Sequence, residues 1–302
     1  MIVAVTLSEL SRVLVLGVVN GAIYSLIAIG LVLVYKASGV FNFAQGEFGT
    51  VAIYGAYLSV TILHLPYGVA LIVGLAAALG MGLLTERLII RPLFDAPRVT
   101  LLVATAGIAL LAIGVEFWRT ANNPLRFFDA IVDSPSSLDR VSPFGVAVSD
   151  QRLITLLVLA VAAFLLYLFF RSPLGLAVLA ASQEPVASEL VGVSVRRIST
   201  ITWGLASLLG GAAGLLYAGG AQFSPGLITA AVLIPGFTAA IVGGITSLPG
   251  AAAGGILVGI LQALGSLSTF ESIKGASFVS VFVVLLIVLL VRPQGLFVGR
   301  ST

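Results

Sequence analysis

Nine long apolar runs follow one another along the chain, and they limit its fold more than any other feature. A helix needs about 20 apolar residues to cross the hydrocarbon core of a bilayer, because each residue adds about 1.5 Å and lipid offers backbone groups no hydrogen-bond partner. We therefore expect an all-α fold, a polytopic bundle of transmembrane helices. The candidate runs are Val13 to Tyr35, Phe41 to Leu63, Tyr67 to Ile90, Leu101 to Trp118, Leu153 to Phe170, Ile201 to Ala221, Leu227 to Ile245, Ala251 to Leu267 and Phe278 to Val291.

The charge content excludes a soluble protein. Only 9% of the 302 residues are charged, whereas a soluble domain carries about 25%. The chain has no cysteine for a disulfide framework, and its 34 glycines lack the strict period of collagen. The fifteen Lys and Arg residues are scattered rather than clustered, which argues against a nucleic-acid partner.

Two of the runs, Phe41 to Leu63 and Leu227 to Ile245, are interrupted by Gly, Pro or polar residues. Such segments are typical of broken or re-entrant helices, so we expect eight to nine spans. The whole chain, residues 1–302, is interpreted as a single transmembrane domain. It has a predicted outer loop at 121–151 and a predicted cytoplasmic loop at 171–198.

Basic residues set the predicted orientation, because cytoplasmic loops carry an excess of Lys and Arg. Nine basic residues fall on one side of the predicted bundle and six on the other, which favours a cytoplasmic C-terminus. The cytoplasmic set is Lys36, Arg87, Arg91, Arg98, Arg171, Arg196, Arg197, Arg292 and Arg300, and the outer set is Arg12, Arg119, Arg126, Arg140, Arg152 and Lys274.

Four pairs of glycines are spaced one helical turn apart. Small residues at this spacing allow two helix backbones to approach closely in a membrane, and they are also compatible with the lining of a pore. We interpret most of them as packing positions. The pairs are Gly17/Gly21, Gly210/Gly214, Gly250/Gly254 and Gly255/Gly259.

A polar segment from Gly39 to Glu47 interrupts the second run. Its Asn42 and Gln45 have the spacing of a capping box, which predicts a helix that begins near Phe43. A helix start at membrane depth leaves unpaired N–H groups and a positive dipole end, as in the broken helices of transporters. Two roles are open for Glu47: a cap of its own helix, or an ionisable group that serves transport.

The predicted cytoplasmic loop contains a second polar cluster. Ser182 or Glu184 is placed to cap a short helix, Pro185 suits its first turn and Gly192 suits a left-handed stop. By itself the loop is compatible with an ordinary connecting helix or with a docking helix. Its predicted outward residues are Gln183, Glu184, Ser188 and Glu189, followed by Arg196 and Arg197.

Four landmarks resemble, in this order, those of permeases from branched-chain amino acid ABC transporters. The segment at Asn42 is similar to the family's Asn-Phe-Ala-His-Gly-Glu signature, and the loop from Ala180 to Val193 is similar to its coupling segment. The run Gly243 to Ala251 and the ending Arg292 to Phe297 match the later landmarks. Gln45 replaces the family's His, so no role of that His in substrate choice or proton coupling is carried over.

The resemblance implies a membrane-spanning subunit of an importer for branched-chain or related small amino acids, in a bacterial inner membrane. Such a permease pairs with a second permease, usually a related one, so a heterodimer or a homodimer is expected. It sits on two cytoplasmic ATPase subunits, and an extracytoplasmic binding protein delivers the amino acid. In such importers ATP and Mg are bound by the ATPases. We therefore expect no cofactor, no metal site and no catalytic residue in this chain, and we do not expect it to be an enzyme.

The resemblance also implies roles for particular residues. The loop from Ser182 to Gly192 is expected to dock on an ATPase, and the interrupted helix and the Ile245 to Gly250 turn are expected to form or gate the path. The docking set is Ser182, Gln183, Glu184, Pro185, Glu189, Gly192, Arg196 and Arg197. The path set is Tyr24, Asn42, Gln45, Glu47, Ser247 and Pro249.

The alternative is a secondary transporter or channel for small polar solutes that needs no ATP. It would require paired ionisable groups in the membrane, and the spans offer little beyond Glu47 and Glu116. Glu116 lies beside Trp118 and Arg119, an interfacial setting that explains it without a proton relay. The chain has no metalloprotease, nucleophile-elbow or phosphate-loop motif. The sequence leaves the substrate open between Leu, Ile or Val and other small solutes such as urea or amides.

Overall fold

The computed structural model describes residues 7–120, 126–127, 150–219, 222–267 and 275–297, and it confirms the all-α prediction. The longer helices are α1 (Leu7–Ser38), α2 (Gln45–Thr61), α3 (Tyr67–Thr85), α4 (Arg98–Thr120), α5 (Asp150–Arg171), α8 (Val195–Ala218), α10 (Leu248–Leu264) and α11 (Ala276–Val291). The shorter ones are η1 (Glu86–Ile90), η2 (Arg91–Leu93), α6 (Pro173–Gln183), α7 (Pro185–Leu190), η4 (Thr229–Leu233) and α9 (Ile234–Gly243). Two short strands, β1 (Arg126–Phe127) and β2 (Gln222–Phe223), pair antiparallel with Arg126 opposite Phe223.

Each of the nine apolar runs contains helix. Five of the described helices are long and apolar enough to cross a membrane, and they lie within α1, α3 with its extension to Leu93, α4, α5 and α8. The apolar segments Thr229–Gly243, Leu248–Leu264 and Ala276–Val291 are shorter, and α2 has 17 residues. The number of spans therefore stays a prediction. Most of the predicted outer loop 121–151 lies outside the described residues, as do Arg140, Lys274 and Arg300.

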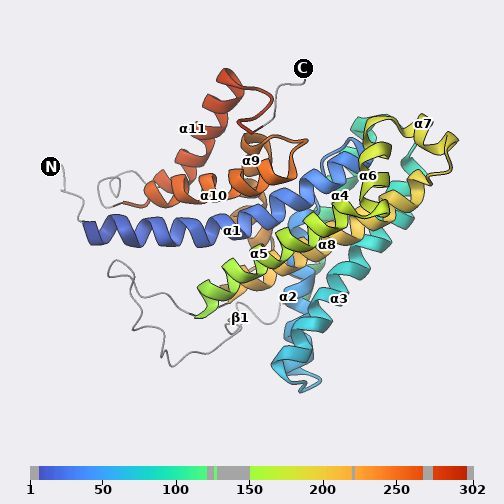
Figure 1. Cartoon of the computed structure of the whole chain (residues 1–302). Helices are drawn as coiled ribbons and strands as arrows, with labels where there is room; N and C mark the ends of the chain where they lie inside the picture. The colour runs from blue at the N-terminus through green and yellow to red at the C-terminus, as the bar shows by residue number, and fades with distance from the viewer. Residues whose placement is uncertain (1–6, 121–125, 128–149, 220–221, 268–274, 298–302) are drawn as a thin grey trace.

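Helix α1 runs through the middle of the bundle, with α10 antiparallel beside it (Figure 1). Helix α8 also packs against α1, and the hairpin of α2 and α3 packs against α8. Apart from Ser25 and Gly30, all residues of α1 from Ala22 to Val34 have hydrophobic side chains. These side chains and Ser25 are at most 4% exposed. A helix that is apolar all round belongs in the interior, so α1 forms the centre of the core.

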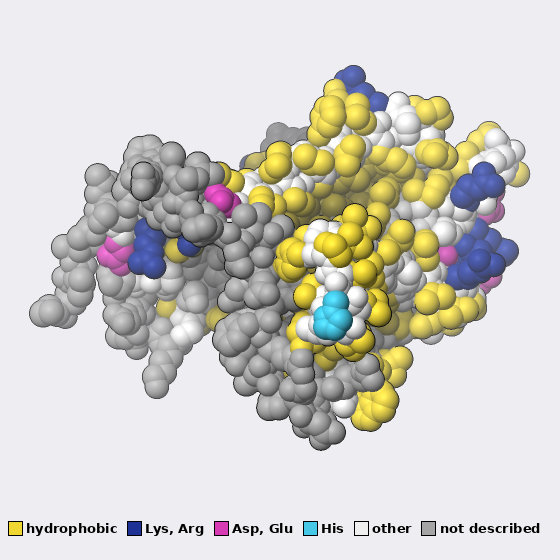
Figure 2. All heavy atoms as spheres, turned by 90° about the horizontal axis from the view of Figure 1, so that it is seen from below, with side chains coloured by type: hydrophobic (Ala, Val, Ile, Leu, Met, Phe, Trp, Pro, Cys, Tyr) yellow, Lys and Arg dark blue, Asp and Glu magenta, His cyan; other side chains and the backbone are white. Residues whose placement is uncertain are grey.

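The outer helices bury little of their apolar surface. Only 11% of the spanning window of α5 is buried, and Leu165 on α5 and Leu286 on α11 are each 58% exposed. On the face that Figure 2 shows, the visible charged side chains of the described residues lie towards the edges of the molecule, and hydrophobic side chains cover much of the surface between them. This distribution suits a chain whose sides meet lipid or another membrane subunit.

The paired glycines are packing positions, as the sequence predicted. Gly17 and Gly21 of α1 lie against α10 near Ile260 and Ile256, and Gly255 and Gly259 of α10 lie against Ser25 and Gly21 of α1. Gly210 and Gly214 lie against α2, at Gln45 and Gly49, and Gly250 and Gly254 lie against α9. Small residues therefore set how closely these helices approach, since apolar burial gives helices in lipid no drive to associate.

One of the two interrupted segments is broken in the structure, and the other stays helical. The chain is not helical between Ser38 and Gln45, and Gly39 has a positive φ of 67°, which glycine adopts readily. The second interruption is a π-helix, η4, that leads directly into α9, with Pro235 in the first turn of α9. Helix α2 begins at Gln45, two residues after the predicted start near Phe43.

We expect Gly255→Ala to destabilise the protein, because the added methyl group would overlap with Ser25 at the crossing of α1 and α10. Overpacking of this kind costs about 1–3 kcal/mol. Gly114→Ala is the matched control, since an added methyl group there meets no atom within 4 Å. Thermal unfolding of the purified variants in detergent checks the prediction. Equal midpoints for the two variants would show that the crossing tolerates a larger residue.

Candidate functional site

Polar side chains replace the missing backbone hydrogen bonds at the break before α2. Asn42 Oδ1 accepts the backbone N–H of Ala44 at 3.0 Å, and its Nδ2 donates to Gln45 Oε1 at 3.3 Å. Gln45 Nε2 then donates to the carbonyl oxygen of Ala206 in α8 at 2.8 Å. Asn42 and Gln45 are fully buried. The predicted capping box is therefore wrong in its second half, because Gln45 reaches across to α8 instead of back to Asn42 N–H.

Aromatic rings and α4 hold the other side of the break. The rings of Phe41 and Phe43 lie 4.9 and 5.9 Å from the ring of Phe237 in α9. Thr105 of α4 accepts the backbone N–H of Phe43 at 3.2 Å. The break thus contacts α4, α8 and α9 at once, and a movement of any of these helices changes its surroundings.

Glu47 lies in the first turn of α2, as predicted, and is fully buried. Its Oε1 accepts a hydrogen bond from the hydroxyl of Thr229 in η4. Glu116 on α4 is a neighbour of Glu47, close enough for the two carboxyl groups to interact. Glu116 is only 5% exposed and accepts the backbone N–H of Gly226 at 2.9 Å. Glu116 is therefore buried within the protein, and its predicted position at the membrane interface stays a prediction.

The predicted docking loop forms two helices instead of one. Helix α6, which the sequence reading missed, begins at Pro173, and the Ser172 hydroxyl caps it by accepting Gly175 N–H at 3.2 Å. Pro185 stands at the start of α7, and Gly192 has a φ of 87°, both as predicted.

The predicted caps of this loop and one of its outward residues are wrong. The Ser182 hydroxyl donates to Leu179 within α6, and Glu184 makes no side-chain cap of α7. Ser188 is 4% exposed, so it faces inward. The other predicted outward residues, Gln183, Glu184, Glu189, Arg196 and Arg197, are exposed.

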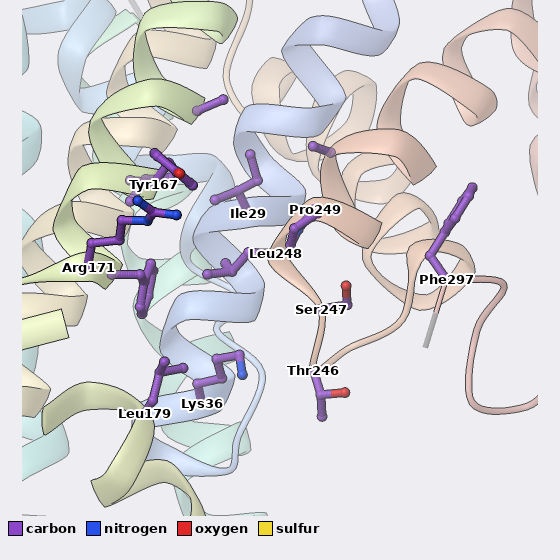
Figure 3. A pocket seen from close by; sticks show the side chains of 14 residues that line it. Ile29, Lys36, Tyr167, Arg171, Leu179, Thr246, Ser247, Leu248, Pro249 and Phe297 are labelled. Carbon is purple, nitrogen blue, oxygen red and sulfur yellow. The ribbon is translucent and has the colours of Figure 1, made fainter. Parts of the chain in front are cut away.

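A cavity of about 740 Å³ lies between α1, α5 and the turn before α10. In Figure 3, Arg171 and Tyr167 line it from α5, and the turn with Thr246 and Ser247 faces them across α1. The guanidinium of Arg171 lies 4.6 Å from the centre of the Tyr167 ring, a cation–π contact. Lys36 lies between Leu179 and Thr246.

A second cavity, of about 570 Å³, shares Lys36 and Thr246 with the first. Its lining includes Gly39, Arg98 and, from the docking loop, Ser182, Gln183 and Glu189. Phe297 lines the first cavity. The two adjoining cavities therefore bring together residues from three of the four sequence landmarks, and Gly39 precedes the remaining one by three residues.

The predicted path residues fall in three separate places. Asn42, Gln45 and Glu47 lie at the break. Ser247 and Pro249 line the first cavity, where the Ser247 hydroxyl caps α10 by accepting Gly250 N–H at 3.0 Å. Tyr24 is buried and donates from its hydroxyl to Gln262 of α10, so it joins two helices. Among the described residues, no group of three His, Asp or Glu side chains is placed to hold a metal ion.

The structure also contains an ion pair that the sequence reading missed. Arg91 contacts the buried Glu86 at 3.1 Å and donates to the Thr200 hydroxyl at 2.7 Å, and Thr200 donates to Glu86 at 3.1 Å. Glu86 and Arg91 are five residues apart, a spacing that one turn of π-helix places on one face. Side chains that pair along an α-helix are three or four residues apart, so the spacing of Glu86 and Arg91 did not indicate an ion pair in the sequence. It ties the end of α3 to the start of α8, directly after the docking loop.

We expect Arg91→Ala to destabilise the protein, since it leaves the Glu86 carboxylate buried without its cation. Breaking a buried ion pair in this way costs about 3–5 kcal/mol, and the low end is expected here because the Arg91 side chain is 33% exposed. The control is Arg87→Ala, which removes an exposed arginine from the same segment. Unfolding midpoints that fall equally in both variants would contradict a special role for the ion pair.

The chain is similar to known proteins over nearly its whole length. A family profile described as "Branched-chain amino acid transport system / permease component" matches residues 13–291. The chain is 30% identical over 299 residues to the high-affinity branched-chain amino acid transport system permease protein BraD of Pseudomonas aeruginosa, with 95% of each chain covered. It is 27% identical to the corresponding LivH of Escherichia coli, with 94% of each covered.

A further relative and one solved structure extend the comparison. The chain is 30% identical to the probable permease LivH of Methanocaldococcus jannaschii, with 90% of this chain and 87% of that one covered. A chain of PsaBC from Streptococcus pneumoniae in complex with Fab gives a TM-score of 0.49 at 17% identity, covering 95% and 92%, a similarity too weak to carry an argument. The family profile spans nearly all of the chain, so the protein belongs to the family of branched-chain amino acid transport permeases and is an integral membrane protein.

Proposed function

We propose that the chain is the membrane-spanning permease subunit of an ABC importer for branched-chain or related small amino acids. Family membership over residues 13–291 supports the class of protein. The observation that carries the mechanism is the position of the docking loop, whose residues line the same cavity as Lys36 and Thr246. A force applied to this loop from outside the membrane reaches the wall of the cavity directly.

The packing of the loop and its exposed charges make it suited to receive such a force. Helix α6 packs against α1, α5 and α8, so the loop cannot move without them. Helix α7 keeps Glu184 and Glu189 exposed, and these carboxylates offer charged positions to a partner surface. The ion pair of Glu86 and Arg91 with Thr200 then joins the start of α8 to α3. Movement of the loop is transmitted through α8 to the break before α2, where Gln45 binds Ala206.

The partners follow from the same assignment. Two cytoplasmic ATPase subunits bind ATP and Mg and close against the docking loops. A second permease, either related or identical, completes the membrane part. An extracytoplasmic protein delivers the amino acid. The chain itself is a transport subunit and not an enzyme. Its setting is a bacterial inner membrane with the C-terminus in the cytoplasm, on the same side as the docking loop.

One observation favours the alternative of a transporter that needs no ATP. Such a transporter requires ionisable groups that meet inside the membrane, and Glu47 and Glu116 do meet. The dependence of uptake on ATP separates the two functions. Proteoliposomes that contain the permease pair, the ATPases and the binding protein should take up radiolabelled leucine only when ATP is present on the side of the membrane that carries the ATPases. Uptake without ATP would favour the alternative.

We expect the double variant Glu184→Lys/Glu189→Lys to uncouple ATP hydrolysis from transport. The change reverses two exposed charges on the docking loop and places a third cation beside Lys36 and Arg98 in the second cavity. Uptake should fall by at least about tenfold, which corresponds to 1.4 kcal/mol of lost coupling, while the amount of inserted protein is unchanged.

The control for the docking variant is Asp95→Lys, a charge reversal at an exposed residue of the loop between α3 and α4. It should leave uptake near that of the unaltered protein. Normal uptake in the Glu184→Lys/Glu189→Lys variant would remove the docking assignment.

A further inference from the structure

The first cavity, between α1, α5 and the turn before α10, is polar at one end and apolar at the other. Lys36 lies in the last turn of α1, and Arg171 is the last residue of α5. About two turns earlier on the same helices, the lining residues are Ile29 and Ala163. Figure 3 shows Lys36 and Thr246 at one end of the cavity and Ile29 towards the other. The polarity of the cavity therefore changes along the direction of the helices.

The third wall of the cavity repeats this order. Thr246 and Ser247 precede α10, and Ala252 lies in the second turn of this helix. The Ser247 hydroxyl caps α10, so the positive end of the helix dipole lies at the polar end of the cavity. All three walls thus present cations or hydroxyls at one end and apolar side chains beyond them.

Lys36 and Arg171 are the charged residues in the lining of this cavity, and the rest of its lining is apolar or carries a hydroxyl. In the part of the chain that the structure describes, neither cation has a carboxylate within ion-pair distance. The guanidinium of Arg171 lies over the ring of Tyr167, which fixes its position, and its N–H groups find no acceptor among the described residues. Two cations without a counter-charge favour an anion as the occupant.

The adjoining second cavity adds one cation and one carboxylate. Arg98 and Glu189 line it together with Lys36. The two cavities together therefore carry three cations and one carboxylate. A zwitterionic amino acid fits the first cavity poorly, because its ammonium group needs a carboxylate and both charged residues there are cations.

Both cations stand where a bilayer changes from hydrocarbon to headgroups. The candidate spans of α1 and α5 end at Ser38 and Arg171. Basic side chains near the ends of spans reach the level of the headgroups. The wall that α5 contributes belongs to a helix whose spanning window is 11% buried, so the apolar end of the cavity borders the exposed apolar surface of the bundle.

Basic pockets between transmembrane helices bind the headgroups of anionic lipids. Arginine donates two parallel hydrogen bonds to a phosphate group, and lysine supplies a compact positive charge. We propose that the first cavity binds one anionic phospholipid. Its phosphate group lies at the end of the cavity that carries Lys36 and Arg171, and one acyl chain extends against Ile29 and Ala163.

The size of the cavity suits this occupant. Its volume of about 740 Å³ falls within the range of about 300–1,000 Å³ that is usual for small-molecule sites. It accommodates the headgroup and the first part of one chain, and the rest of the lipid stays in the bilayer. The lining is mostly apolar, which a lipid needs and a free phosphate ion does not.

A lipid in this position contacts elements that are far apart in the sequence. Leu179 of α6 and Phe297 near the end of the described chain also line the cavity. The lipid therefore joins α1, α5, α6 and the C-terminal segment directly beside the docking loop. This site goes beyond the proposed function, because binding of the lipid requires neither an ATPase nor a transported amino acid.

Native mass spectrometry of the purified full-length chain in mild detergent, with any partner subunit that remains bound, tests the proposal. The protein is titrated with phosphatidylglycerol or with phosphatidylcholine of the same acyl chains. We expect one tightly bound phosphatidylglycerol per chain and at least about tenfold weaker binding of phosphatidylcholine, because each basic residue near a membrane surface contributes about fivefold to the attraction of an anionic lipid. Equal affinities for the two lipids would overturn the proposal.

Two soluble competitors separate a lipid from other occupants. Glycerol phosphate carries the phosphate group without an acyl chain, and leucine carries a carboxylate beside an ammonium group. Neither should displace phosphatidylglycerol, even in large excess. Displacement by glycerol phosphate would reveal a site for a free anion, and displacement by leucine would reveal a substrate site. Either result would contradict the assignment to a lipid.

The variant Lys36→Gln/Arg171→Gln should bind the two lipids equally. Its matched control is Arg87→Gln/Arg292→Gln, which removes two exposed arginines that line neither cavity and should keep the preference. If the double variant does not fold, Arg171→Gln at the exposed end of α5 should still lose about fivefold in affinity for phosphatidylglycerol. A preference that survives loss of the cavity's cations, or that falls equally in the control, would place the lipid elsewhere.

The position of the acyl chain is tested by Ala163→Trp, which fills the apolar end of the cavity from an exposed position on α5. Binding of phosphatidylglycerol should weaken by at least about tenfold, the effect of excluding two methylene groups from an apolar site. Ala160→Trp is the control, since Ala160 is also exposed on α5 and does not line the cavity. Equal binding by the two variants would exclude an acyl chain from the cavity. These readouts do not depend on transport, so their failure is distinguishable from a failure of the proposed function.

Discussion

A backbone inside a membrane has to find every hydrogen bond within the protein, and the fold of this permease depends on how that demand is met where helices stop. The break before α2 is the clearest case. Asn42 takes the N–H of Ala44, and Thr105 takes the N–H of Phe43, while Gln45 binds the neighbouring helix α8. Without these three side chains an interrupted helix at this depth would leave several polar groups unpaired, at a cost of a few kcal/mol each. The interruption is thus a hydrogen-bonded part of the fold.

The second condition is close approach between helices that gain nothing from burying apolar surface against one another. Glycine and serine supply it along the whole α1–α10 contact, where the Ser25 hydroxyl donates to Ala252 O at 2.7 Å. The same device lets Gly49 meet Gly214 between α2 and α8. A tightly packed centre with an exposed apolar periphery follows.

The sequence was sufficient for the features that follow from local periodicity. Apolar runs predicted the helices, Gly pairs predicted their contacts, and Pro185 and Gly192 predicted the bounds of α7. It was insufficient where a partner comes from far along the chain. The reach of Gln45 to Ala206, the burial of Ser188 and the meeting of Glu116 with Glu47 all depend on packing between helices, and no local spacing encodes them. The pair of Glu86 and Arg91 was missed for another reason, since its spacing fits a π-helix.

The contact between the end of the described chain and the turn before α10 bears on how the protein is made. Leu296 N–H donates to Val242 O at 2.8 Å, and Gly295 lies against Gly244 with a φ of 94°. This contact can form only after Leu296 has left the ribosome, when the preceding helices are already synthesised. The wall that Phe297 contributes to the cavity is therefore added only after all the preceding helices have been synthesised.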